Sequence, residues 1–159
     1  LSSTSPTLPT GYLFSCYMGA MRADGSSNLL RTIQKGSTAQ YQLQSSGNTN
    51  VLPEAGTTTS VTMAAISVTA TVPATATAIN LLVYNAATGV NAYVAPNTNY
   101  TTTVGTTLAP LSSEAAAGVH AIASVWMLLE GTSVFAATAA AGGTVHVDVV
   151  GWRDAVNAN

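Results

Sequence analysis

Apolar and polar residues alternate along most of this 159-residue chain, and β-branched residues carry much of the alternation. Successive side chains of a strand point to opposite faces of a sheet, so this period of two is typical of half-buried β-strands. No segment shows the periodicity of a helix of ordinary length. The pattern therefore predicts an all-β protein. The expected strands lie at residues 12–20, 29–33, 39–44, 58–72, 79–84, 90–94, 119–129 and 144–151.

Two regions carry a more specific strand signal. Between residues 58 and 72, the apolar side chains keep one face up to Ala65 and change face at Ile66, which predicts a single long strand with a β-bulge. Segments 79–84 and 90–94 are separated by turn-forming residues, and we interpret them as the clearest β-hairpin of the chain.

Shorter signals predict turns and loops. A turn near Lys35 and Gly36 is expected to join strands 29–33 and 39–44 as part of a β-meander. Residues 96–110 are polar and threonine-rich, which predicts a long loop with one short strand. Residues 112–117 are expected to open one helical turn with a serine N-cap, and the Ala/Gly-rich residues 136–143 are expected to connect the last two strands.

Eight or nine strands with short turns favour a single-domain antiparallel β-sandwich of the jelly-roll type. A chain of this length builds one core of ordinary size rather than two. We expect an extended N-terminal arm at residues 1–10, the sandwich domain at 11–154 and a short tail at 155–159. The arm is rich in Pro and Thr and has neither the basic nor the apolar region of a signal peptide.

Charge is scarce in this protein. Charged residues make up 6% of the chain, against about 25% in typical domains, and residues 55–113 contain no Asp, Glu, Lys, Arg or His. That stretch cannot carry proton transfer or ordinary metal ligation. Because soluble monomers normally keep a charged surface, we expect much of the surface to be covered by copies of the chain or by another protein. No basic cluster indicates a nucleic-acid partner, and no apolar run is long enough to span a membrane.

The strongest enzymatic hypothesis rests on His146 and Asp148, which alternate along one expected strand and therefore share a face. They could form a dyad or two metal ligands, with His120 or a distant Glu as the third. We favour the simpler interpretation that both face solvent or a neighbouring subunit. The sequence therefore predicts no catalytic residue, no metal ligand and no cofactor, and we do not expect an enzyme.

The aromatic residues offer a second hypothesis. Trp126 lies inside a strong strand and is expected in the core, whereas Trp152 is expected over a sheet edge or against a subunit. A carbohydrate-binding module could use Trp152, or the tyrosines Tyr84, Tyr93 and Tyr100, as a stacking platform.

The region 12–31 resembles the opening of small structural proteins of tailed-phage virions, in which an I-G-A-x-R-x-D-x-S-G-N-I stretch precedes a Gln, a Gly and an aromatic strand. The chain departs from that pattern at Ser26 and Ser27, where the family carries Ser-Gly. The segments 72–76 (Val-Pro-Ala-Thr-Ala) and 147–152 (Val-Asp-Val-Val-Gly-Trp) are similar to later parts of the same proteins.

The resemblance implies a β-sandwich subunit, commonly trimeric, on the outside of a capsid or in a tail fibre, with no catalytic or cofactor residues. We therefore expect a structural virion protein at the exterior of the particle, where it decorates and cements the shell. Its expected partners are two further copies in a homotrimer and the major capsid protein or neighbouring virion proteins. The arm 1–10 and part of the stretch 55–113 are expected to make these contacts. A tail-fibre or receptor-binding subunit that binds a host-surface glycan is the alternative.

Overall fold

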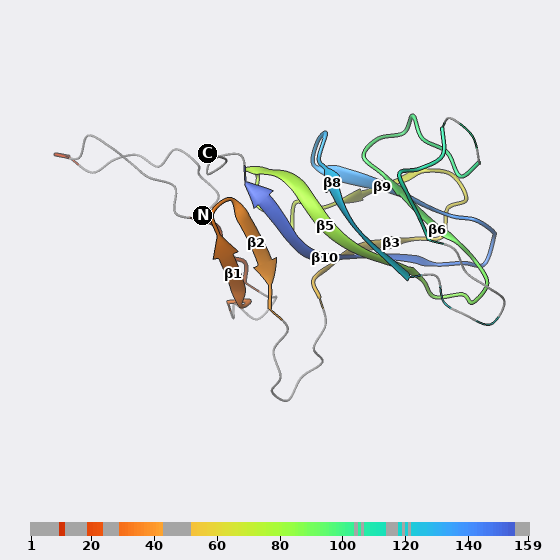
Figure 1. Ribbon diagram of the computed structural model, residues 1–159, viewed down its shortest axis with the longest axis horizontal. Coiled ribbons are helices and arrows are strands. Elements are labelled where there is room, and N and C mark those ends of the chain that lie inside the picture. The colour runs from red at the N-terminus through yellow and green to blue at the C-terminus, as the bar shows by residue number, and fades with distance from the viewer. Residues whose placement is uncertain are drawn as a thin grey trace.

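The computed structural model describes residues 10–11, 19–23, 29–42, 52–103, 105, 107–113, 118, 120 and 122–154. Every regular element of this part of the chain is a β-strand, and the strands form two antiparallel sheets that pack together (Figure 1). The prediction of an all-β sandwich is therefore confirmed. Most of the expected arm 1–10 and strand 12–20, and all of the tail 155–159, lie outside the described residues.

The larger sheet contains six strands in the order β1-β2-β10-β5-β8, with β3 also paired to β10. Their bounds are β1 (Thr32–Lys35), β2 (Thr38–Tyr41), β3 (Glu54–Thr58), β5 (Ala76–Asn85), β8 (Ile122–Leu128) and β10 (Val145–Asp154). The smaller sheet has the order β4-β9-β6-β7. Its strands are β4 (Ala64–Ser67), β6 (Ala92–Ala95), β7 (Leu111–Ser113) and β9 (Ser133–Thr138).

Strand β10 is the centre of the larger sheet. It pairs with β5 along its whole length, while its other edge pairs first with β3 and then with β2. Val145, Val147 and Val149 alternate into the interior, where each is fully buried. The strand predicted at residues 144–151 is confirmed, and it continues past a bulge near Val150 to the buried Trp152.

The core lies between the two sheets. It contains Ile79, Leu81 and Val83 of β5, together with Val94 of β6 and Val134 of β9 from the opposite sheet. These residues have almost no exposed surface, so their burial supplies the main driving force for packing the sheets.

A second, smaller cluster lies on the outer face of the smaller sheet. Tyr93 and Ala95 of β6 pack there against Ala109, with Tyr100 and Leu108 beside them. The expected loop 96–110 therefore folds over its own sheet, and all four residues of β6 are buried. Part of the charge-free stretch 55–113 is covered by the chain itself.

The strand pairs are nested. Strand β3 pairs with β10, β4 with β9, β5 with β8 and β6 with β7. From β3 onward the chain runs as one long antiparallel hairpin that is bent across the two sheets. The pairs β5–β10 and β6–β9 then close each sheet.

The predicted hairpin between 79–84 and 90–94 is wrong. These segments form β5 and β6, which belong to different sheets, so the chain crosses between sheets after Asn85. The buried Asn85 side chain accepts from the Ala87 amide at 3.0 Å and donates to Asn91 O at 3.3 Å and Thr138 Oγ1 at 3.1 Å. Turn-forming residues indicate a reversal, but the strand partner depends on side-chain contacts that are remote in sequence.

The single strand predicted at 58–72 is also wrong. The chain forms β3 and β4 in different sheets and crosses between them through residues 59–63, where Val61 is 48% exposed. Ile66 and Val68 are buried as the alternation indicated. Beyond Ser67 the chain turns, with the amides of Thr71 and Val72 donating to Val68 O. The apolar residues of this segment change face at Ile66 because the chain forms two separate strands, and not because one strand contains a bulge.

Two further predictions concern short strands. Ser112 and Ser113 belong to β7, where the Ser113 hydroxyl bonds the backbone of Ala92. The rest of the expected helical turn, residues 114–117, lies outside the described residues. Residues 136–138 belong to β9 and are buried. Their Ala-rich composition is similar to that of a loop, yet small side chains also fit a strand that is covered on both faces.

We predict that Gly151→Ala lowers the free energy of unfolding by about 1–3 kcal/mol, because overpacking at a buried site forces backbone shifts. A Cβ at Gly151 would collide with the Ala39 carbonyl oxygen of β2, where the two strands approach closely. Chemical denaturation would measure the loss. Gly131→Ala is the matched control, because a Cβ there meets no atom within 4 Å. Equal stability of the two variants would contradict the prediction.

Candidate functional site

The outer face of the larger sheet carries the side chains that the sequence analysis singled out for chemistry. His146 and Asp148 of β10 share this face, as their spacing predicted, and Glu54 of β3 and Tyr84 of β5 lie beside them. The described structure thus brings Glu54 to His146. A distant Glu was one of the two possible third ligands in the sequence hypothesis, and the sequence did not indicate which Glu it would be.

A β-bulge positions this glutamate. Val147 of β10 pairs with Gly56, whereas Asp148 pairs with Glu54, so Ala55 is the extra residue. The bulge turns Glu54 onto the outer face, where its Oε1 accepts a hydrogen bond from His146 Nδ1 at 2.7 Å. The Tyr84 ring stacks on the imidazole, with a centroid distance of 4.6 Å and an interplanar angle of 2°. The imidazole is therefore held by both neighbours.

Two pKa values are shifted in this cluster. Partial burial raises the pKa of Asp148, the Glu54 carboxylate opposite raises it further, and His146 partly offsets the shift. Desolvation also raises the pKa of the Tyr84 hydroxyl, with Asp148 and Glu54 adding to it. Two carboxylates on neighbouring strands therefore repel each other at neutral pH.

The geometry is that of a hydrogen-bonded histidine–glutamate pair on the surface, with an aromatic neighbour. Among the residues that the structure describes, no group of three or more His, Cys, Asp or Glu could hold a metal ion. The other histidine, His120, lies apart from this cluster and bonds the Asn85 carbonyl through Nδ1 at 3.0 Å. His120 and His146 are therefore not brought together.

The positions of the two tryptophans are the reverse of those expected. Trp152 is 1% exposed and packs edge-on against Tyr41, with ring centroids 5.3 Å apart. Trp126 is 38% exposed on the outer face, and the Arg153 guanidinium lies 4.5 Å from its ring centroid. The bulge near Val150 shifts the later residues of β10 by one face, which turns Trp152 inward and Arg153 outward.

This arrangement removes most of the predicted carbohydrate platform. Trp152 is in the core, and Tyr93 is 7% exposed beneath the loop 96–110. Tyr84 lies on the outer face of the larger sheet and Tyr100 on that of the smaller sheet. The two partly exposed tyrosines therefore do not form one platform.

An exposed apolar surface on β8 was not predicted from the sequence. Strand β8 is the last strand of the larger sheet, and its outward side chains include Ile122 (65% exposed), Trp126 and Leu128 (72% exposed). Alternation predicted this strand, but the same pattern fits a central and an edge strand equally well. We call the outward row Ile122, Ser124, Trp126 and Leu128 the β8 row.

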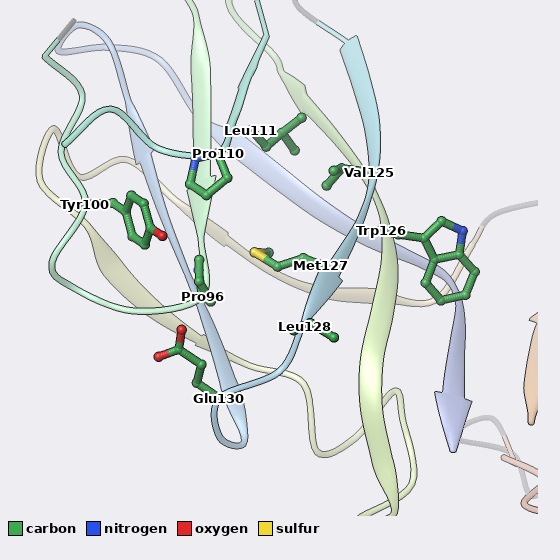
Figure 2. A pocket seen from close by; sticks show the side chains of 9 residues that line it. All are labelled: Pro96, Tyr100, Pro110, Leu111, Val125, Trp126, Met127, Leu128 and Glu130. Carbon is green, nitrogen blue, oxygen red and sulfur yellow. The ribbon is translucent and has the colours of Figure 1, made fainter. Parts of the chain in front are cut away.

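Next to β8 the surface forms a hollow of about 310 Å³ at the open edge of the sandwich. Figure 2 shows Tyr100, Pro110 and Leu111 on one side, with Val125 and Met127 of β8 facing them and Trp126 pointing away. The remaining residues that line it are Pro96, Leu128 and Glu130. Its lining is mostly apolar, as in sites that accept hydrophobic side chains.

No protein-family model matches the chain, and no curated protein matches it in sequence. The resemblance to phage structural proteins therefore rests on the quoted motifs alone. In the part of the chain that the structure describes, no helix is long and apolar enough to cross a membrane.

We predict that Asp148→Asn raises the melting temperature at pH 7 by up to about 3 °C, because partial burial and the like charge of Glu54 together disfavour the Asp148 carboxylate by less than about 1 kcal/mol. A carboxyl pKa that is higher in the folded state destabilises the fold at pH values above it. The advantage of the amide should shrink as pH falls through that raised pKa and vanish below the ordinary value of 3.8. A gain that persists at pH 3 would contradict this explanation.

Proposed function

We propose that this chain is a structural protein of a tailed-phage virion, where it decorates and stabilises the exterior of the shell. The observation that supports an assembly role most strongly is the β8 row. It exposes three large apolar side chains on a protein with only ten Asp, Glu, Lys and Arg residues, and such exposed rows mark interaction surfaces.

The strand connectivity supports the same class of protein. We infer that the nested pairs β3–β10, β4–β9, β5–β8 and β6–β7 form a jelly roll, which is the architecture of many viral capsid proteins and lectins. A fold does not fix a function, so this argument counts only together with the surface and the motif resemblance.

The exterior of the capsid is favoured over a tail fibre because the sequence has no heptad or collagen-like repeat that could build a shaft. The partners proposed for this role are the major capsid protein or neighbouring virion proteins. The cluster of His146, Glu54 and Asp148 serves as an ordinary solvated part of the surface.

The proposal predicts that purified particles contain this chain at tens to hundreds of copies each, because decoration proteins repeat with the shell lattice. Quantitative mass spectrometry against the major capsid protein would measure the ratio. Cryo-electron microscopy would then place the density. A ratio of a few copies, with density at the tail tip alone, would support the tail-fibre alternative and contradict decoration of the shell.

One observation favours carbohydrate binding as a second candidate function. The exposed ring of Trp126 and the neighbouring Arg153 form the aromatic and polar pair that a sugar could contact. For this function, glycan-array binding should be lost in Trp126→Ala and retained in Leu128→Ala, since an aliphatic side chain offers no stacking face. Absence of binding by the unmodified protein would exclude this candidate on the glycans sampled.

A further inference from the structure

Strand β8 differs from the other edge strands of the sandwich. Within the described residues, β8 pairs with β5 on one side, and no strand pairs with its other side. Edge strands are normally protected by short length, charge, Pro or a bulge, because an exposed ladder attracts further strands. Strands β1, β3, β4 and β7 are three to five residues long, and Lys35 and Glu54 lie in β1 and β3.

None of these protections applies to β8. It has seven residues, contains no charge and no Pro, and pairs with β5 without any shift of register. Its outward side chains at both ends are the exposed Ile122 and Leu128. A strand of this kind is suited to receive another strand.

We propose that the free edge of β8 binds β8 of a second copy of the chain, antiparallel and across a two-fold axis at Val125. This inference goes beyond the proposed function, because it concerns the isolated protein and holds for any assembly that contains it. The contact is isologous, so it closes with two copies, whereas the trimer expected from the sequence would need another surface.

The backbone geometry permits this pairing. The Leu129 amide donates to Thr77 O at 2.9 Å, so odd-numbered residues of β8 direct their backbone groups toward β5. Because these directions alternate in antiparallel ladders, Ile122, Ser124, Trp126 and Leu128 direct theirs toward the free edge. The even-numbered residues therefore supply the hydrogen bonds between the two copies.

The side chains are complementary in this register. Ile122 lies opposite Leu128 of the second copy, and Ser124 lies opposite Trp126, so a small residue faces the largest one. Cross-strand pairs of this kind stabilise sheets. On the inner face, Ala123, Val125 and Met127 of the added strand extend over the apolar hollow beside β8. One strand therefore covers both the β8 row and the mouth of the hollow.

Complementary groups at the two ends of β8 favour a second copy as the occupant. His120 precedes the strand and Glu130 follows it, so an antiparallel partner brings the His120 end of each copy to the Glu130 end of the other. Both residues are exposed, and each is oriented by a hydrogen bond, His120 to Asn85 O and Glu130 from Asn97 Nδ2 at 2.8 Å. Each end of the contact thus brings an imidazole and a carboxylate into the same region.

The first test is the concentration dependence of the mass. Sedimentation or light scattering of the full chain should show a reversible species at twice 16.0 kDa. Leu128→Glu should raise its dissociation constant on the order of tenfold or more, because two-fold symmetry places the new charges in the apolar contact twice. Val61→Glu is the control, since Val61 is also exposed but lies between β3 and β4.

The second test determines the register. Val125 would pair with itself in a non-hydrogen-bonded site, where Cα atoms are about 4.5 Å apart and within disulfide range. In a Cys16→Ser background, Val125→Cys should therefore form a disulfide-linked dimer on mild oxidation. Ala123→Cys should not, because the two copies of that position are offset by roughly 13 Å along the strands.

Circular dichroism spectra that match the unmodified protein show that each variant is folded. A protein that stays monomeric up to millimolar concentration would overturn the proposal. An oligomer whose mass is unaffected by Leu128→Glu, or equally rapid cross-linking of both cysteine variants, would also overturn it. Such results would not contradict the virion proposal, because the virion proposal is tested by the composition of particles and not by the mass of the isolated chain.

Discussion

The burial of β10 between its neighbours is the interaction on which the rest of the sandwich depends. Its inward valines fill the centre of the core, and its backbone pairs with β2, β3 and β5. Removing this strand would leave β2 and β3 without their link to β5. The same strand also supplies the outward His146, Asp148 and Arg153, so the core and the outer surface are positioned by a single element.

Near the end of β10, a small polar network replaces apolar packing. Trp152 donates from Nε1 to the buried Asp154 carboxylate at 3.4 Å, and the Thr75 hydroxyl donates to the same carboxylate. Tyr41 packs on Trp152, and its hydroxyl donates to Thr71 O at 2.5 Å. Each polar atom thus has a partner, as burial in a core requires. These contacts hold β2 and the turn before β5 against the last strand.

Local sequence patterns predicted most strands and the loop 96–110, because alternation depends only on which face of a strand is buried. They did not predict which strands pair. Asn85 was interpreted as part of a hairpin turn, yet its contact to Thr138 fixes a crossing between sheets. The exposure of Trp126 and the burial of Trp152 depend on edge position and on a bulge, and neither is visible in one strand. The meeting of Glu54 with His146 likewise needs residues 92 positions apart.

The nested strand pairs have a consequence for how the chain folds. The innermost pair, β6 with β7, joins nearby residues, whereas β3 must find β10 across some 90 residues. Such long-range pairing makes folding slow, because the chain loses the entropy of closing a long loop before the contact between the strands can stabilise it. During synthesis, the centre of the larger sheet is made last. Until β10 emerges, β3 has no pairing partner, and β2 and β5, although paired with β1 and β8, each keep one edge unpaired. The nascent chain therefore exposes several strand edges at the same time.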